Sequence, residues 1–131
     1  MGKDIALIVD DNEVNRKLLE YVLEGGDFEV CMAANAAEAL QVLASVRPDV
    51  ILMDLQLPGT SGLDLTRRLK AHPQWRDIAI IAVTSYAMKG DEQKARAAGC
   101  DGYLTKPIDV TTFVQDVRDV IAWQRGEPPA E

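Results

Sequence analysis

Several polar side chains in this sequence stand at the ends of short apolar runs, where a buried core would not place them. They are Asp10, Asp11, Asp54, Thr84 and Lys106. Two adjacent aspartates repel each other by roughly 4 kcal/mol at about 4 Å and an effective dielectric near 20, so we expect a positive group close to them. Clustered carboxylates with one ammonium suit a hard divalent cation with oxygen ligands, and Mg²⁺ is the ion that this set predicts.

The same set has a chemical interpretation as a phosphoryl acceptor. A carboxylate nucleophile can form an aspartyl-phosphate, a metal can neutralise the transferring group, and lysine and threonine can hold its remaining oxygens. Asp54 is the expected nucleophile because it ends the predicted central strand. Of the adjacent aspartates Asp10 and Asp11, we expect one to reach the ion and the other to act through water.

Short apolar runs predict the strands that position these groups. Continuous runs at 5–9, 50–53 and 78–83 are typical of strands that are covered on both faces in a parallel sheet. The run at 28–32 contains a charge, so we expect it at an edge of the sheet. A further strand is expected to end at Lys106.

Residues at helical spacing lie between these runs and predict five helices. The first carries Val14, Leu18 and Val22, the second follows an Asn35 cap with Glu38 three residues later, the third covers 62–71, and the fourth covers 88–98 and stops at Gly99. The fifth is capped by Asp109 and repeats apolar residues at Val110, Phe113, Val114, Val117, Val120 and Ile121.

Strand and helix signals alternate five times, which predicts an α/β fold with a doubly wound, five-stranded parallel sheet and five helices. In the flavodoxin-like strand order 2-1-3-4-5, ligands bind between the carboxyl ends of the first and third strands, where Asp10, Asp11 and Asp54 should meet. Residues 1–125 are expected to form one domain, and 126–131 a flexible C-terminal tail.

Composition limits the partners. The chain has 131 residues, of which 47% are hydrophobic and 27% charged, with a net charge of -7, and this acidic balance argues against nucleic acid as a direct partner. No apolar run could span a bilayer and no signal peptide precedes the first strand, so we expect a cytoplasmic protein with no membrane partner. Cys31 and Cys100 lack CxxC spacing, which favours plain thiols, and His72 is expected at a helix end.

Four stretches in order along the chain carry a family resemblance. They are Val9-Asp10-Asp11-Asn12, Met53-Asp54-Leu55-Gln56-Leu57-Pro58-Gly59, Val83-Thr84-Ser85 and Tyr103-Leu104-Thr105-Lys106-Pro107. From Ile5 to Trp123 the chain resembles the receiver domain of two-component response regulators. The stretch 84–91 is similar to that of receivers in hybrid sensor kinases and of single-domain regulators of bacterial cell division and polarity.

The resemblance implies a signalling switch without an output domain rather than an ordinary enzyme. Asp54 would accept a phosphoryl group from a phosphohistidine on a sensor histidine kinase or a histidine phosphotransfer protein. Asp11, Asp54 and the backbone carbonyl of Gln56 would bind Mg²⁺, and Asp10 would complete the acidic pocket through water.

The resemblance also implies how the switch works. Lys106, aimed inward by a cis peptide to the following proline, would pair with the phosphoryl oxygens, and Thr84 would turn its hydroxyl toward them as Tyr103 moves inward. Gln56 and Tyr86 occupy family positions that tune the phosphoryl lifetime. A downstream protein target would bind the face formed by the fourth helix, the fifth strand and the fifth helix.

Other functions stay open at this point. A haloacid-dehalogenase-like phosphatase also uses an aspartate nucleophile and Mg²⁺, but Gln56 replaces the second aspartate of its DxD motif. A flavodoxin-like cofactor carrier would need a phosphate-binding loop where the stretch 10–13 carries three acidic residues. A receiver from a larger hybrid kinase is a third alternative, although Met1 so near the first strand favours a free-standing regulator.

Single residues also have simpler interpretations. Asp10 and Asp11 could cap a helix, Thr84 could satisfy local backbone groups, and Tyr103 could pack against the last helix. Their combination at the ends of successive strands is what favours a site.

Overall fold

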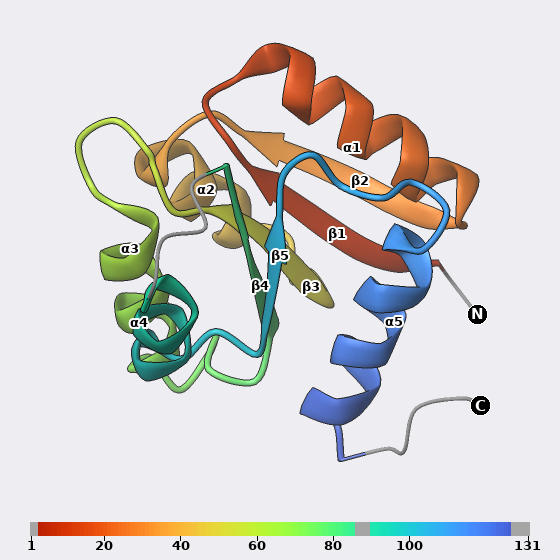
Figure 1. Cartoon of the computed structure of the whole chain (residues 1–131). Helices are drawn as coiled ribbons and strands as arrows, with labels where there is room; N and C mark the ends of the chain where they lie inside the picture. Colours follow the sequence, from red (N-terminus) through yellow and green to blue (C-terminus); the bar gives the residue numbers. More distant parts are fainter. Residues whose placement is uncertain (1–2, 86–89, 127–131) are drawn as a thin grey trace.

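The computed structural model describes residues 3–85 and 90–126. Its five strands form one sheet, and Figure 1 shows helices on both faces of that sheet. The elements in chain order are β1 (Asp4–Val9), α1 (Glu13–Gly25), β2 (Phe28–Ala33), α2 (Ala36–Leu43), β3 (Val50–Asp54), α3 (Gly62–Lys70), β4 (Ala79–Thr84), α4 (Asp91–Ala98), β5 (Gly102–Thr105) and α5 (Phe113–Gln124). Strands and helices alternate throughout, as the apolar runs predicted.

The sheet has the predicted topology. Its strands are parallel and follow the order β2-β1-β3-β4-β5, so the predicted fold class is confirmed. β2 lies at an edge, as the charge within its sequence indicated. β3 lies between β1 and β4 with all of its residues buried, which explains why its sequence is apolar up to the final Asp54.

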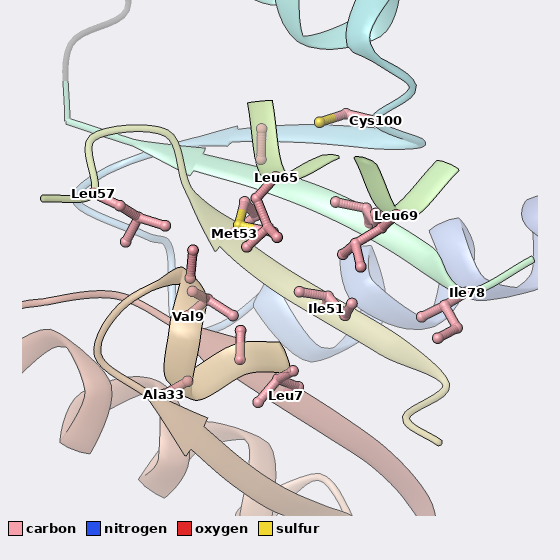
Figure 2. Close-up of a cluster of buried hydrophobic side chains, with 14 of the residues drawn as sticks. Leu7, Val9, Ala33, Ile51, Met53, Leu57, Leu65, Leu69, Ile78 and Cys100 are labelled. Carbon is pink, nitrogen blue, oxygen red and sulfur yellow. The ribbon is translucent and has the colours of Figure 1, made fainter. Parts of the chain in front are cut away.

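Each face of the sheet has its own core, because alternate strand residues point to opposite faces. On one face Leu7 and Ile51 belong to a cluster that includes residues of α2, α3 and α4, and Figure 2 shows this cluster. On the other face Ile8 and Leu52 pack with residues of α1 and α5. Each fully buried Leu or Ile contributes roughly 1.5–3 kcal/mol to the free energy of folding. The two cores therefore stabilise the sheet whose carboxyl end carries the polar residues.

α1 buries a different face from the one that the sequence pattern picked out. Val14 is 76% exposed and Leu18 44% exposed, whereas Leu19 and Leu23 are buried against the sheet and Val22 is half-buried. Two apolar stripes with i, i+4 spacing coexist on this helix, and spacing alone does not say which of them meets the sheet. The structure leaves the first stripe largely uncovered.

The predicted cap Asp109 forms a turn ahead of α5. Its carboxylate accepts hydrogen bonds from the Thr111 hydroxyl at 2.6 Å and the Thr111 N–H at 3.0 Å, and these bonds lower the pKa of Asp109. The Asp109 carbonyl also accepts hydrogen bonds from the N–H groups of Thr112 at 3.1 Å and Phe113 at 2.9 Å, and the regular helix begins at Phe113 with Thr112 at the N-cap position. Val110 lies on the turn and is 52% exposed, instead of lying on the buried face.

The other helices begin and end close to the predicted positions. The Asn35 side chain accepts a hydrogen bond from the Glu38 N–H at 2.9 Å, and Gly99 ends α4 with a φ of 112°. The fourth helix starts later than predicted: α4 begins at Asp91 instead of 88, because Gly90 has a left-handed backbone with a φ of 90° and cannot continue a helix. Residue 88 itself and the tail residues 127–131 lie outside the described residues, so the flexible tail stays a prediction.

Remaining features of the described chain agree with plain structural roles. No helix among the described residues is long and apolar enough to cross a membrane. Cys31 and Cys100 are free thiols, and burial raises the pKa of both, which disfavours the reactive thiolate. His72 follows the end of α3 and stacks on Trp75 with ring centroids 4.4 Å apart.

Candidate functional site

Three carboxylates meet at the carboxyl edge of the sheet, as the sequence predicted. β1 and β3 are neighbours with Val9 opposite Met53, so the residues that follow these two come side by side. One carboxylate oxygen each from Asp10, Asp11 and Asp54 lies within 4.8 Å of the others. Asp10 and Asp54 are buried and Asp11 is exposed, so the cluster opens to solvent at Asp11.

Lys106 supplies the positive charge that the adjacent aspartates require. Its Nζ lies 2.8 Å from Asp10 Oδ2 and 3.6 Å from Asp54 Oδ2, and its side chain is 14% exposed. The Lys106 N–H donates to the Thr84 carbonyl at 2.8 Å, which joins the end of β5 to the end of β4. The peptide bond to Pro107 is cis, as the resemblance implied.

Asp10 is held at each of its polar atoms. Its N–H donates to the Ala33 carbonyl at 3.1 Å, and its own carbonyl accepts a hydrogen bond from Arg16 Nη1 at 2.8 Å. Oδ1 accepts from the Asn12 N–H at 2.8 Å, and Oδ2 accepts from Lys106. These bonds fix both the direction of the Asp10 carboxylate and the turn that follows β1.

Asp54 has a raised pKa. Burial is the largest cause, because it disfavours the ionised form of a side chain that is only 8% exposed. The Gln56 N–H, 2.9 Å from Oδ1, and the Lys106 ammonium oppose the shift, while Asp10 and Asp11 add to it. Ionised Asp54 is therefore costly in this environment, and a bound cation would offset that cost.

The two predicted switch residues lie on the neighbouring strands. Thr84 is buried at the end of β4, one residue beyond the partner of Asp54 in the sheet register. Tyr103 lies on β5 and is half-buried against the core. Desolvation raises the pKa of Tyr103, and the carboxylates of Asp91 and Glu92 raise it further.

Known proteins are similar to this chain in sequence and in fold. The sequence model of the response regulator receiver domain matches residues 6–118. The polar-differentiation response regulator DivK of Brucella anthropi is 44% identical over 115 residues, which cover 88% of this chain and 94% of that protein. A putative response regulator from Chloroflexus aurantiacus has a TM-score of 0.87 at 33% identity, over 92% of this chain and 98% of that one. The chain belongs to the response regulator receiver domain family.

Membership in the receiver family confirms the resemblance seen in the sequence. It makes the protein a two-component signalling switch rather than an ordinary enzyme, and it implies a histidine kinase as partner. The phosphatase and flavodoxin-like alternatives are thereby set aside.

The acidic cluster of this receiver fits a magnesium ion. Hard cations prefer carboxylate and carbonyl oxygens, and within the described residues no hydrogen bond or ion pair engages the Asp11 carboxylate. The receiver domain of a sensor histidine kinase from Pseudomonas aeruginosa has a magnesium ion coordinated in its active-site cleft. That domain is 31% identical to this chain with a TM-score of 0.80, over 97% of this chain and 100% of that one.

The two residues predicted to tune the phosphoryl lifetime are only partly placed. Gln56 is exposed, and its N–H binds the Asp54 carboxylate. Tyr86 lies outside the described residues. Their influence on the lifetime stays a prediction.

Sequence reasoning missed two residues that shape the receiver's site. Arg16 was not singled out, because the reach of a long side chain to a backbone carbonyl leaves no signal in spacing. Gly62 was interpreted only as a helix start, yet a Cβ at Gly62 would lie 2.2 Å from the Asp54 carbonyl oxygen. A glycine directly after the Ser61 helix cap was a usable signal of this close approach.

Proposed function

We propose that Asp54 accepts a phosphoryl group from a phosphohistidine on a sensor histidine kinase or a histidine phosphotransfer protein. The observation that carries this proposal is the place of Asp54 inside the acidic cluster, with Lys106 Nζ 3.6 Å from Oδ2. The Gln56 N–H engages Oδ1, which makes Oδ2 the nucleophilic oxygen.

The transfer is a displacement at phosphorus. Oδ2 of ionised Asp54 attacks, the new P–O bond forms as the N–P bond of the phosphohistidine breaks, and the electron pair of that bond returns to the imidazole, which takes up a proton from solvent. The raised pKa of Asp54 works against ionisation, so the reaction depends on a cation that offsets the cost.

Magnesium would supply that charge, both to Asp54 and to the oxygens of the transferring group. Asp11, Asp54 and the backbone carbonyl of Gln56 would hold the ion directly. Asp10 would act through water, because hydrogen bonds from Asn12 and Lys106 already engage both of its carboxylate oxygens.

Lys106 and Thr84 would bind the oxygens of the phosphoryl group. Lys106 stands between the carboxylates of Asp10 and Asp54, so it can turn toward new oxygens on Asp54. The Thr84 hydroxyl would follow, and Tyr103 would move inward. The change would then alter the face formed by α4, β5 and α5, to which a downstream protein target would bind.

The donor is expected to dock on an exposed apolar surface beside the site. This surface, here called the donor face, consists of Val14, Leu18, Tyr21 and Val110, which are 76%, 44%, 80% and 52% exposed. Leu18 also lines a cavity of about 80 Å³ together with Lys106, so the donor face borders the lysine that pairs with Asp10 and Asp54. A histidine-bearing helix laid across this surface could present its phosphohistidine to Asp54.

A cytoplasmic location and the absence of a nucleic-acid partner complete the proposal. The net charge of -7 supports the second point, because an acidic surface repels a phosphate backbone.

Intact-mass analysis after incubation with acetyl phosphate tests the proposal. We expect one added phosphoryl group on the wild type with Mg²⁺, and none without Mg²⁺ or on Asp54→Asn. Asp77→Asn serves as the matched control, since Asp77 is an exposed aspartate just before β4 at the opposite edge of the sheet. An adduct that persists on Asp54→Asn would identify a different acceptor.

A further inference from the structure

We propose that Arg16 is a positioning residue for the metal ion of this receiver, an inference that rests on the proposed metal site. Arg16 lies in α1 and is half-buried, and its Nη1 donates a hydrogen bond to the Asp10 carbonyl at 2.8 Å. The Arg16 N–H also donates to the Asn12 carbonyl at 3.0 Å, so the residue is anchored in the helix from which it reaches back. This contact closes the turn on which the adjacent aspartates stand.

The bond from Arg16 determines where Asp11 points. The peptide that joins Asp10 to Asp11 is planar, so a fixed Asp10 carbonyl oxygen also fixes the N–H and the Cα of Asp11. The Asp10 N–H is already held by the Ala33 carbonyl, and Arg16 holds the one polar atom of Asp10 that no other bond engages. Within the described residues nothing holds the Asp11 carboxylate itself, so its direction depends on this backbone.

Arg16 should affect Mg²⁺ affinity in two opposite ways, through its hydrogen bond to the Asp10 carbonyl and through its positive charge. A guanidinium beside a cation site repels a divalent ion, so its charge alone would weaken Mg²⁺ binding. Arg16 is not among the groups that shift the pKa of Asp54, where Lys106 is the cation that acts. We expect geometry to dominate, because residues that orient metal ligands from behind change affinity by about 10- to 100-fold.

Mg²⁺ dissociation constants from NMR titration with magnesium chloride test this role. We expect Arg16→Gln to weaken Mg²⁺ binding by about tenfold. Arg16→Lys should recover part of the loss, because an ammonium can still donate to the Asp10 carbonyl. Arg47→Gln is the matched control: Arg47 Nη1 also donates to a backbone carbonyl, that of Gln74 at 2.6 Å, but at the opposite edge of the sheet. It should bind Mg²⁺ as the wild type does.

Thermal unfolding without Mg²⁺ separates positioning from a general loss of stability. Arg16→Gln and Arg47→Gln should lower the melting temperature by a similar few degrees, and only the former should lose Mg²⁺ affinity. Unchanged or tighter Mg²⁺ binding by Arg16→Gln would overturn the proposal, since tighter binding is what loss of the charge alone predicts. If Arg16→Gln does not fold, Arg16→Ala decides in the same way, because alanine also removes the donor and the charge and favours the helix.

The wild type distinguishes this inference from the proposed function. If the wild type and Arg16→Gln bind Mg²⁺ with the same affinity, Arg16 is not a positioning residue, but the proposed metal site stands. A wild type that binds no Mg²⁺ would remove the metal site, and the role of Arg16 with it.

Discussion

Asp54 is held in an environment that opposes its own ionisation, and this has a consequence for stability. Without Mg²⁺, removal of its charge should relieve the desolvation and the repulsion from Asp10 and Asp11. We expect Asp54→Asn to raise the free energy of unfolding by about 1 kcal/mol at pH 7 in EDTA, measured by urea denaturation. The exposed Asp77→Asn should leave it unchanged. A destabilised Asp54→Asn would mean that the ion pair with Lys106 outweighs the burial cost.

The pH dependence of this effect has a definite sign. Between the ordinary carboxyl pKa of the unfolded chain and the raised pKa of folded Asp54, the folded state binds more protons than the unfolded state. Asp54 therefore lowers stability as pH rises through that interval, and the full cost remains above it. The advantage of Asp54→Asn in urea denaturation should accordingly disappear below the interval. An advantage that grows on acidification would contradict the raised pKa.

Lys106 is expected to contribute most to the stability of the fold when no metal ion is bound. Within the described residues it is the cation within ion-pair distance of Asp10 and Asp54. Lys106→Met should lower the free energy of unfolding by about 3 kcal/mol in EDTA and by much less at saturating Mg²⁺, because the ion replaces the lost charge. Lys17→Met removes an exposed pair with Glu13 and should cost less than about 1 kcal/mol in both conditions. Equal losses of Lys106→Met with and without Mg²⁺ would point to packing instead of charge.

At the scale of elements, the start of α3 is fitted against the end of β3. A Cβ at Gly62 would lie 2.2 Å from the Asp54 carbonyl oxygen, so Gly62→Ala must displace either α3 or the end of β3 that carries Asp54. We expect a loss of about 2 kcal/mol in unfolding free energy and slower labelling by acetyl phosphate. Gly25→Ala is the control, because a Cβ there meets nothing within 4 Å and alanine favours a helix. A neutral Gly62→Ala would show that α3 can shift at little cost.

The donor face allows a test of how the phosphoryl donor binds. Leu18→Ser together with Tyr21→Ser should slow phosphoryl transfer from a histidine phosphodonor by about tenfold, through loss of apolar contact area, and leave labelling by acetyl phosphate unaltered. Trp123→Ser removes another exposed apolar side chain, 65% exposed on α5, and should change neither rate. Equal slowing with both donors would place the defect in the acidic cluster instead of the donor face.

Element types and their order were predictable, but the buried face of α1 and the start of α5 were not. Continuous apolar runs identified the buried strands, and the charge in Phe28–Ala33 identified the edge. On α1 the wrong stripe was favoured, because both stripes have helical spacing and only packing on the sheet selects one. At α5 the bonds from Thr111 to the Asp109 carboxylate form a turn, and the regular helix follows from Phe113, a boundary that apolar spacing does not show.

At the scale of the whole molecule, the candidate site was predictable because its parts lie far apart in sequence but at one edge of a parallel sheet. Asp54 ends a strand and Asp10 and Lys106 each come just after one, and the topology brings Lys106 within ion-pair distance of both aspartates. What sequence could not give was the framework around them. The reach of Arg16 and the close approach at Gly62 depend on three-dimensional packing that no spacing records.

The central claim is that Asp54 carries the phosphoryl group as an acyl phosphate, and chemical trapping tests it most directly. The protein is incubated with acetyl phosphate and Mg²⁺, then treated with borohydride, which reduces an aspartyl-phosphate to homoserine, and its peptides are sequenced by mass spectrometry. We expect homoserine at position 54 alone, and only in samples that contained Mg²⁺. An unreduced Asp54 in protein that carries the phosphoryl group elsewhere, on Asp10, Asp11 or a hydroxyl side chain, would contradict it.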